Sequence, residues 1–551
     1  MTPADIGKHG RCLRGARLVG VLAVGLVAAL GSPATAAQTR AQHTSVQSPA
    51  VFDRYLDDIV SRYQLPGIAV GVVADGKVVY RGTRGELVVG SGRKIDSDTL
   101  FKIASNSKAM TGALLARLVD QKKLKWEDPV VKHLPDFRMY QDWVSREIQV
   151  RDLLIHNSGL GPGAGDLMLW PDPNLFTRAD VIHGLRYLKP VYSFRSRYAY
   201  DNTLYIVAGE VAAAAGGAPF ETLIRREVFA PLAMNRCQVG EWNRDAIGNV
   251  AQPHAQRDGH NVLTRADGEV IPNLPMMAAG GIRCSLDDML TWTRAWLQPD
   301  ATMVDGRPWL SQAQREEVWK AQMLMPLSRR MRDWDGSHYS AYGYGWRLTD
   351  VDGTRKVSHT GTLGGMYSAL TLLPDKHVGF VVMINGDADQ ARTVLTQVLV
   401  KHFTSPDMRA SVADYAQRLQ RERQQETSAA KPLPDTSDRV AATATDLGAN
   451  AGVYRDPWFG EVSICPETER SASAMVFRAA KSPKMVGDIK RSGQRLLVQW
   501  RQRDVDQEPW IAFVAASGNT QPRMTMARID QDGDFSSDYQ DLAFTRVRDC
   551  R

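Results

Sequence analysis

The sequence lacks the motifs of several large enzyme classes. It has no Gly-x-Ser-x-Gly elbow, no His-Glu-x-x-His pair and no Walker loop, which argues against an α/β-hydrolase, a zinc protease and a nucleotide-binding protein. It has no long run of Lys and Arg with interleaved aromatic residues, so no nucleic-acid partner is expected. Cysteine is scarce, with five residues in 551, and its spacing does not resemble a zinc site. We therefore expect no metal and no cofactor.

The composition is that of a globular chain with room for two or more domains. Hydrophobic residues make up 43% and charged residues 23% of the sequence, which excludes disordered, collagen-like and multi-span membrane proteins. The formal net charge is +7, and part of it lies in the N-terminal segment. The remainder is a mildly basic surface of the kind that many soluble proteins have.

Residues 1–36 have the layout of a secretory signal peptide. Basic residues precede an apolar run from Leu18 to Leu30, and the small-residue site Ala34-Thr35-Ala36 follows. The run is short for a bilayer span, although an uncleaved N-terminal anchor is the alternative interpretation. No cysteine stands at the cleavage site, so a lipoprotein anchor is not indicated. We expect a secreted or periplasmic protein with no stable membrane anchor after cleavage.

The cysteines are consistent with an oxidising compartment. Cys12 leaves with the signal peptide, and the four that remain allow three pairings. We expect Cys237–Cys284 and Cys465–Cys550, because each of these bridges stays within one domain. Buried free thiols are the alternative for the first pair.

The chain beyond the signal divides into a large mixed domain and a smaller β-domain. After a flexible segment, residues 37–50, apolar residues at helical spacing predict a helix over 51–63, and two hairpins are predicted at 68–80 and 367–384. Strands near both ends of residues 51–405, with helices between them, predict an α+β domain. In it an antiparallel sheet is flanked by helices and carries a helical subdomain. Residues 406–444 are predicted to form a charged helix and a linker.

The sequence pattern of residues 445–551 predicts a small all-β domain, either a sandwich or a barrel. Six short apolar runs are separated by turn signals such as Asp532-Gly533. Cys465 and Cys550 fall near the first and last of these runs, so a bridge between them would close the domain. This domain is either a recognition or oligomerisation module, or a part that only packs against the larger domain or forms a lid over it.

Ser105 and Lys108 form the first candidate pair for catalysis. Both precede an apolar helical run, so they lie one turn apart on the same side of a helix N-terminus. A serine hydroxyl needs a neighbouring base before it attacks a carbonyl. A lysine enclosed near positive potential, such as a helix N-terminus, has a lowered pKa and can act as that base. The alternative is a helix cap followed by a solvated lysine.

Two further short motifs complete the candidate site. Tyr200 and Asn202 stand on a turn before a helix, where a phenol and an amide can point into one cleft. His359-Thr360-Gly361 precedes the late hairpin, which places a cationic or donor side chain on an edge strand whose backbone can face a substrate. Taken separately, Tyr200 could belong to the core and His359 could be a satisfied strand-end histidine.

Taken together, these motifs resemble a known family. Ser105-x-x-Lys108, Tyr200-x-Asn202 and His359-Thr360-Gly361 match in order and rough spacing the three motifs of class C β-lactamases, D-alanyl-D-alanine carboxypeptidases and related serine esterases and D-aminopeptidases. Residues 153–160, 279–285 and 344–346 are also similar to segments of that family. The resemblance covers residues 50–403, and the C-terminal part looks like the β-domain often appended to such hydrolases.

The resemblance implies a serine hydrolase acting on a small-molecule or peptide substrate. Ser105 attacks a carbonyl and forms an acyl-enzyme, while Lys108 and Tyr200 share general-base work and Lys108 holds down the pKa of Tyr200. Asn202 orients substrate and Lys108. The backbone N–H groups of Ser105 and Thr362 form an oxyanion hole. His359, Thr360 and Gly361 orient the substrate, and His359 helps to bind a carboxylate or to steer protons.

One departure bears on the substrate. Class C β-lactamases usually carry Lys-Thr-Gly as the third motif, and here it is His359-Thr360-Gly361. A histidine near its ordinary pKa is only partly charged at neutral pH, which favours a peptidase or esterase over an efficient β-lactamase. The alternatives are a β-lactamase and a slowly deacylating penicillin-binding or cell-wall sensor protein. The loop from Gly161 to Arg178 either lines the cleft or only covers the helical subdomain. The oligomeric state is not predicted.

Overall fold

A computed structural model describes residues 49–304, 306–407, 411–467, 471–503, 505–514 and 521–550. The predicted signal peptide, residues 1–36, and nearly all of the segment 37–50 lie outside the described residues. Among the described residues no single helix is long and apolar enough to cross a membrane. One bent pair, Thr203–Gly216 with Phe220–Phe229, has the length and composition for it.

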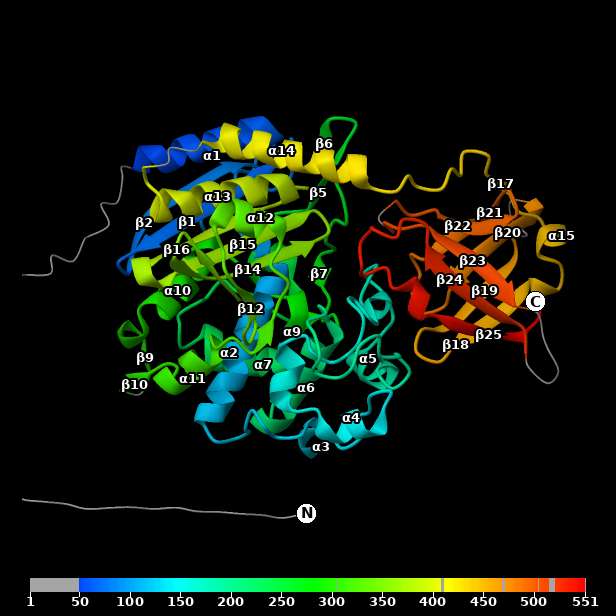
Figure 1. Cartoon of the computed structure of the whole chain (residues 1–551), viewed down its shortest axis with the longest axis horizontal. Coiled ribbons are helices and arrows are strands. Elements are labelled where there is room, and N and C mark those ends of the chain that lie inside the picture. Colours follow the sequence, from blue (N-terminus) through cyan, green and yellow to red (C-terminus); the bar gives the residue numbers. More distant parts are fainter. Residues whose placement is uncertain are drawn as a thin grey trace, which may run out of the picture. The chain divides into compact units, whose positions relative to one another are not determined.

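The larger domain is built on an antiparallel sheet that draws strands from both of its ends, as the two predicted hairpins indicated (Figure 1). Strands from the start of the domain, β1 and β2, join the sheet next to β16, which comes from its end. In spatial order the strands of this sheet are β11 (Met323–Leu324), β12 (Ser340–Tyr342), β13 (Arg347–Val351), β14 (Thr354–Leu363), β15 (Met366–Leu373), β16 (Val378–Ile384), β1 (Gly67–Ala74) and β2 (Lys77–Gly85).

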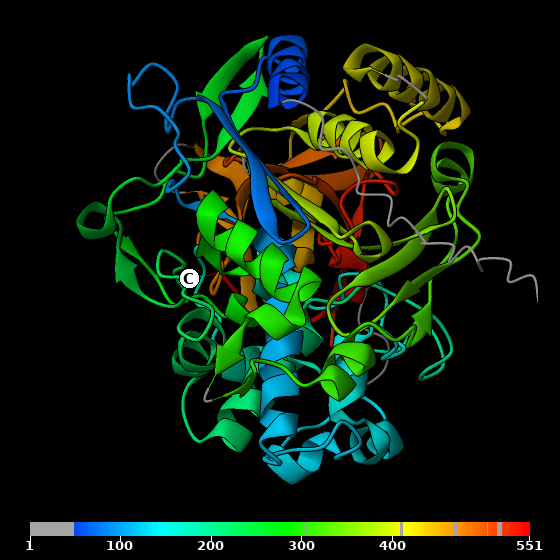
Figure 2. The same ribbon diagram turned by 90° about the vertical axis from the view of Figure 1, so that its left-hand side faces the viewer.

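Helices cover both faces of this sheet, which explains why every residue of β1 is buried. Its side chains alternate: Val70 and Val72 belong to one apolar cluster and Ala69 and Val73 to another. Each buried valine contributes about 1.5–3 kcal/mol relative to exposure. On one face lie α1 (Pro49–Tyr63), α13 (Asp389–Thr404) and α14 (Val412–Ala429), side by side in Figure 2. On the other face lies α10 (Leu286–Leu297).

The helical subdomain surrounds α2, which begins two residues after Ser105 and carries Lys108 in its first turn. Residues 107–116 of α2 are all buried, because α6, α9 and α11 contact this helix. The helices between β2 and β12 are α2 (Ser107–Asp120), α3 (Val130–His133), α4 (Asp142–Glu147), α5 (Arg178–Gly184), α6 (Thr203–Gly216), α7 (Phe220–Ile224), α8 (Arg244–Ile247), α9 (Met277–Gly280), α10, α11 (Gln312–Val318) and α12 (Arg329–Asp335).

Short two-stranded pairs connect these helices. They are β3 (Phe101–Lys102) with β8 (Arg283–Cys284), β4 (Trp242–Asn243) with β7 (Val270–Ile271), β5 (His254–Arg257) with β6 (His260–Leu263), and β9 (Met303–Val304) with β10 (Arg307–Pro308). The Cys237–Cys284 disulfide anchors β8, and β8 pairs with the strand that leads into Ser105. This bridge confirms the first predicted pairing.

The C-terminal domain is a closed antiparallel barrel, which decides between the two predicted alternatives. Strand β22 pairs with both β23 and β21, so the eight strands from β18 to β25 form a ring, and the short β17 adds to β21. Its strands are β17 (Val440–Ala441), β18 (Gly452–Asp456), β19 (Gly460–Glu467), β20 (Ser471–Ala479), β21 (Val486–Ser492), β22 (Arg495–Trp500), β23 (Pro509–Val514), β24 (Arg523–Arg528) and β25 (Ala543–Arg548).

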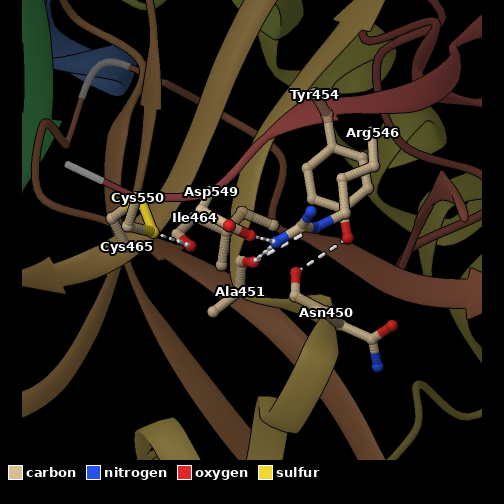
Figure 3. The surroundings of a disulfide bond; sticks show 8 residues. All are labelled: Asn450, Ala451, Tyr454, Ile464, Cys465, Arg546, Asp549 and Cys550. Atoms are coloured by element: carbon tan, nitrogen blue, oxygen red, sulfur yellow. Dashed lines mark hydrogen bonds and ion pairs between the residues drawn. A yellow bond between two sulfur atoms is a disulfide. The ribbon is translucent and has the colours of Figure 1, made fainter.

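The predicted bridge between Cys465 and Cys550 ties the end of the barrel to β19. Figure 3 shows its surroundings, where Arg546 donates to the carbonyl of Ala451 at 2.7 Å and Tyr454 donates to the carbonyl of Asn450 at 2.7 Å. The bond from Arg546 fastens the last strand, β25, to the segment that enters the first, β18, and the bond from Tyr454 holds that segment against β18 itself. The barrel is thereby closed by side-chain contacts as well as by its backbone ladder.

Candidate active site

Ser105 lies in a single 3₁₀ turn between β3 and α2. The turn spans Ala104–Asn106, and α2 begins at Ser107, so the serine precedes the helix that carries Lys108. Ala104 has a φ of +48°, a conformation that few residues other than glycine adopt. The turn is held by Asn106, which donates to Ser368 Oγ at 2.8 Å, and Ser368 donates in turn to the carbonyl of Ile103 at 2.8 Å. Strand β15 therefore fixes the position of the serine.

The structure brings Ser105, Lys108 and Tyr200 into mutual contact. Lys108 Nζ lies 3.1 Å from Ser105 Oγ, and Tyr200 Oη lies 2.9 Å from the same oxygen. Lys108 Nζ also donates to Asn202 Oδ1 at 2.7 Å and to the carbonyl of Ala279 at 2.9 Å. Two sequence-distant segments, 105–108 and 200–202, thus meet around one hydroxyl as their motifs predicted, and a third segment contacts Lys108 through Ala279.

Lys108 is fully buried, and its environment disfavours the charged form. Burial lowers the pKa of Lys108 to about 7, and the guanidinium of Arg347 adds to this effect. The carboxyl groups of Asp166 and Asp201 oppose it. Desolvation is thus the main cause, and Arg347 supplies positive potential of the kind that the sequence analysis expected. The result agrees with the prediction of a lysine able to act as a base near neutral pH.

The predicted effect of Lys108 on Tyr200 is wrong. Burial raises the pKa of Tyr200 to about 12, and the group that opposes this rise most is Arg347. Desolvation penalises the phenolate more than the nearby cations favour it. Tyr200 is therefore a neutral phenol throughout the physiological pH range, and Lys108 is the group whose proton is exchangeable near pH 7.

His359 does not take the place predicted for it. Its side chain is 1% exposed, its Nε2 lies 2.8 Å from Tyr342 Oη, and its Nδ1 lies 2.7 Å from the carbonyl of Thr360. Burial, together with Arg347 and Lys108, lowers the pKa of His359 well below its ordinary value. This placement matches the alternative of a satisfied histidine and does not support the predicted help in carboxylate binding, because the imidazole is neutral, faces Tyr342 and does not line the cavity around Ser105.

The strand that carries the third motif is an edge strand only over its second half. β14 pairs with β13 from Thr354 to Ser358 and with β15 from Val357 to Leu363. A Cβ atom added to Gly361 would lie 2.2 Å from the carbonyl oxygen of Ile103, so only glycine lets the strand approach the Ser105 segment. Thr360 and Thr362 line the same cavity as Ser105, whereas His359 does not.

Arg347 is a cavity residue that the sequence did not single out. It lies at the start of β13, and its Nη1 donates to Thr360 Oγ1 at 2.7 Å. It also hydrogen-bonds the Tyr198 hydroxyl. Among the residues that the structure describes, no carboxylate forms an ion pair with it. In the sequence, the feature that could have pointed to Arg347 is its position directly after the 344–346 segment. A single arginine in a strand has many structural uses, so this position alone did not distinguish it.

The three flanking segments hold neighbouring parts of the site in place. His156, at a φ of +59°, accepts from the amide of Asp201 at 3.1 Å and so holds the turn that carries Tyr200 and Asn202. The 279–285 segment supplies the carbonyl of Ala279 to Lys108. Gly345 has a φ of +84° and an added Cβ atom there would lie 2.4 Å from the carbonyl oxygen of Lys108. These segments hold Lys108, Tyr200 and Asn202 in place.

The cavity above Ser105 has a volume of about 1060 Å³ and is lined by both domains. From the 161–178 loop come Leu167, Trp170 and Pro171, which shows that this loop lines the cleft. From the barrel come Arg503, Val505, Asp506 and residues 532–537. Within the described ranges, no cluster of His, Cys, Asp and Glu side chains has the arrangement of a metal site.

The fold and this cluster define a hydrolase of the serine β-lactamase type. A family model described as Beta-lactamase matches residues 52–402, and the chain belongs to this family.

Similar proteins of known name support the assignment to this family. The chain is 24% identical to "Unguisins hydrolase ungD'" of Aspergillus campestris, over 76% of this chain and 78% of that protein. It is 25% identical to the D-alanyl-D-alanine-carboxypeptidase/endopeptidase AmpH of Escherichia coli, over 61% and 83% respectively. Among solved structures, an octameric penicillin-binding protein homologue from Pyrococcus abyssi superposes with a TM-score of 0.54 at 17% identity. That match covers 90% of this chain and 99% of that one, and it extends the shared fold beyond the hydrolase domain.

Proposed function

We propose that the protein hydrolyses amide or ester bonds through an acyl-enzyme formed on Ser105. The observation that carries this proposal is the position of Ser105 Oγ, which is 3.1 Å from Lys108 Nζ and 2.9 Å from Tyr200 Oη. A hydroxyl held between an amine and a phenol has a base to take its proton and an acid to return one.

The hydrogen-bond inventory of Lys108 supports its role as the base. A neutral amine has two N–H donors and one lone pair. The carbonyl oxygens of Asn202 and Ala279 accept from Nζ at 2.7 and 2.9 Å. The lone pair is then directed at Ser105 Oγ, ready to accept the hydroxyl proton as Oγ attacks the carbonyl carbon.

Tyr200 completes the proton path. As Ser105 Oγ bonds to the carbonyl carbon, its proton passes to Lys108, and the neutral Tyr200 phenol donates a proton to the departing amine or alcohol. Transfer from Lys108 to Tyr200 restores the phenol. Hydrolysis of the acyl-enzyme repeats these steps in reverse, with a water molecule in the place of the leaving group. The N–H groups of Ser105 and Thr362 are proposed to bind the oxyanion.

The preferred substrate carries a carboxylate close to the scissile bond. Arg347 presents a permanent charge to the cavity beside Thr360, and no ion pair within the described residues neutralises it. This favours a peptidase of the carboxypeptidase kind, and the relative named as a D-alanyl-D-alanine carboxypeptidase supports that class. A β-lactam also carries a carboxylate, so a β-lactamase is the second candidate. A slowly deacylating sensor would differ from both in its rate of acyl-enzyme hydrolysis.

A three-substrate screen tests the proposal. The purified protein is assayed with nitrocefin, a p-nitrophenyl ester and a peptide ending in D-Ala-D-Ala, with Ser105→Ala as the matched control. We expect turnover of the peptide or ester, lost in Ser105→Ala, and a mass increase on Ser105 that decays within the assay. Wild-type rates in Ser105→Ala would refute the proposal, and a persistent adduct without turnover would favour the sensor.

We further propose that the protein acts outside the cytoplasm. The two disulfides, Cys237–Cys284 and Cys465–Cys550, support an oxidising compartment. Cell fractionation with an activity assay tests this, and activity confined to the cytosol would contradict it.

A further inference from the structure

One loop of the barrel enters the active-site cavity. It spans residues 529–538, between β24 and the 3₁₀ turn Tyr539–Asp541, and residues 532–537 line the same cavity as Ser105. At its tip the ring of Phe535 lies edge-on to the ring of Tyr200, with a centroid distance of 6.0 Å. A Cβ atom added to Gly163, whose φ is +71°, would lie 2.7 Å from Phe535, so the loop sits directly on the 161–178 segment.

Asp538, at the base of this loop, holds the backbone on either side of Asp166. Its Oδ2 accepts from the amide of Gly165 at 2.6 Å, and its Oδ1 accepts from the amide of Leu167 at 3.0 Å. Asp538 and Asp166 are both 0% exposed. A buried carboxyl group is retained in a fold only with such partners, because its desolvation cost is large.

Ser536 connects the loop to the catalytic lysine through two side chains. Its hydroxyl donates to Asp166 Oδ2 at 2.8 Å, and Asn202 Nδ2 donates to the same oxygen at 2.9 Å. The other end of the Asn202 amide, Oδ1, accepts from Lys108. The other oxygen of Asp166, Oδ1, is buried without a hydrogen-bond partner among the described residues. All side-chain anchorage of this carboxyl group therefore passes through Oδ2.

We propose that the 529–538 loop of the barrel belongs to the active site. Through Ser536, Asp166 and Asn202, the loop holds the Lys108 amine in its orientation toward Ser105. This inference rests on the proposed function, because it assigns Ser536 and Asp538 as positioning residues for the acyl-transfer step. The barrel then does more than pack against the hydrolase domain. Without the loop, Asp166 opens to water and the Asn202 amide is free to rotate away from Lys108.

The contact between Asp166 and Asn202 decides which end of the Asn202 amide faces Lys108. Its Nδ2 can donate only to an acceptor such as Asp166, and this fixes Oδ1 toward Lys108. An amide turned the other way would present N–H donors to the Lys108 amine, which then could not keep its lone pair aimed at Ser105. Loss of the Ser536 bond weakens the acceptor that sets this orientation. The effect falls on the chemical step, so kcat is expected to change and KM is not.

The test compares Ser536→Ala and Ser536→Thr with a matched control, Ser492→Ala. Ser492 is a serine of the same barrel that also donates to a carboxylate, that of Asp438 at 2.5 Å, and it does not line the cavity. We expect Ser536→Ala to lower kcat about tenfold, the effect of roughly one lost hydrogen bond, with KM within twofold. Ser536→Thr, which keeps the hydroxyl, should recover most of the rate, and Ser492→Ala should match the wild type.

A second variant keeps the inference open to refutation. Asp538→Asn places an N–H donor against the amide of Gly165 or Leu167 and should lower kcat more than Ser536→Ala does. Its melting temperature is measured alongside, and if this variant does not fold, the Ser536 pair decides alone. Wild-type kcat in Ser536→Ala, or equal losses in Ser536→Ala and Ser536→Thr, would overturn the inference. Ser105→Ala distinguishes this outcome from a failure of the proposed function, because it alone tests the nucleophile.

Discussion

The pH dependence of turnover offers a sharp test of Lys108 as the base. The pKa of Lys108 is lowered to about 7 by burial and by Arg347. The catalytic form is the neutral amine, which is populated above that pKa and lost below it. Tyr200, whose pKa is raised to about 12, keeps its proton over the whole working range. The plot of kcat/KM against pH should therefore rise through one ionisation near pH 7 and remain level to about pH 10.

The magnitude follows from the fraction of neutral amine. With a pKa of about 7, roughly 1% of Lys108 is neutral at pH 5 and about half at pH 7, so kcat/KM should fall about a hundredfold between the plateau and pH 5. With an ordinary lysine pKa of about 10.4, only about 0.4% would be neutral at pH 8, and the rate would climb steeply up to pH 10. The two cases differ most between pH 8 and pH 10.

The assay is hydrolysis of an uncharged p-nitrophenyl ester, with the Ser105→Ala protein as the blank. Asp166 and Asp201 also face Lys108, and burial raises the pKa of both carboxyl groups. Asp166→Asn therefore serves as a control, in which an ionisation should persist at the same or a lower pH, because a charged Asp166 raises the pKa of Lys108. The temperature dependence of the ionisation distinguishes Lys108 from the two aspartates, because an amine ionises with a much larger enthalpy than a carboxyl group. A rate that still climbs between pH 8 and pH 10, or a temperature-independent ionisation, would refute the assignment.

Three further substitutions follow from the geometry. Arg347→Ala should lower kcat/KM about a hundredfold for a peptide with a free C-terminal carboxylate. The loss should be much smaller for its amidated counterpart, whose rate changes only through the rise in the Lys108 pKa that follows removal of the guanidinium; equal losses for the two peptides would rule out carboxylate recognition. Phe535→Ala removes the ring that stands over Tyr200 and should raise kcat/KM for bulky acyl groups relative to small ones. An unchanged ratio in that comparison would show that the ring does not limit substrate size. Replacing Cys465 and Cys550 by serine removes a bridge that spans 85 residues and should destabilise the barrel by about 4.5 kcal/mol in a chain-entropy estimate, measured by urea unfolding of the oxidised wild type and the variant.

The sequence predicted the elements whose apolar pattern follows a single period. The helix over 51–63 and the two hairpins appear as α1, β1–β2 and β15–β16 with ends within a few residues. In the barrel, β20 and β21 were not predicted. β21 reads Val-Gly-Asp-Ile-Lys-Arg-Ser, in which Ile489 is the one large apolar residue among its buried positions. Alternation of so few apolar side chains is not visible without the neighbouring strands.

The candidate site was predictable as far as its residues carry fixed motif spacing. Ser105, Lys108, Tyr200 and Asn202 lie together as expected. Contributions from outside the motifs were not predictable, because they depend on how segments far apart in the chain meet. Ser536 stands 370 residues from Asp166, its hydrogen-bond partner, and nothing local distinguishes it from the other serines of the barrel.

The third motif shows why residue type alone did not give the electrostatics of the cleft. A histidine in place of lysine suggested a weak and pH-dependent attraction for carboxylates. The structure buries His359 against Tyr342 and keeps it neutral, while Arg347 from the adjacent strand β13 reaches Thr360 on the cavity side. A guanidinium stays charged at every pH at which the protein is folded. The positive charge of the cleft is therefore permanent, and the proposed carboxylate recognition does not depend on the titration of a histidine.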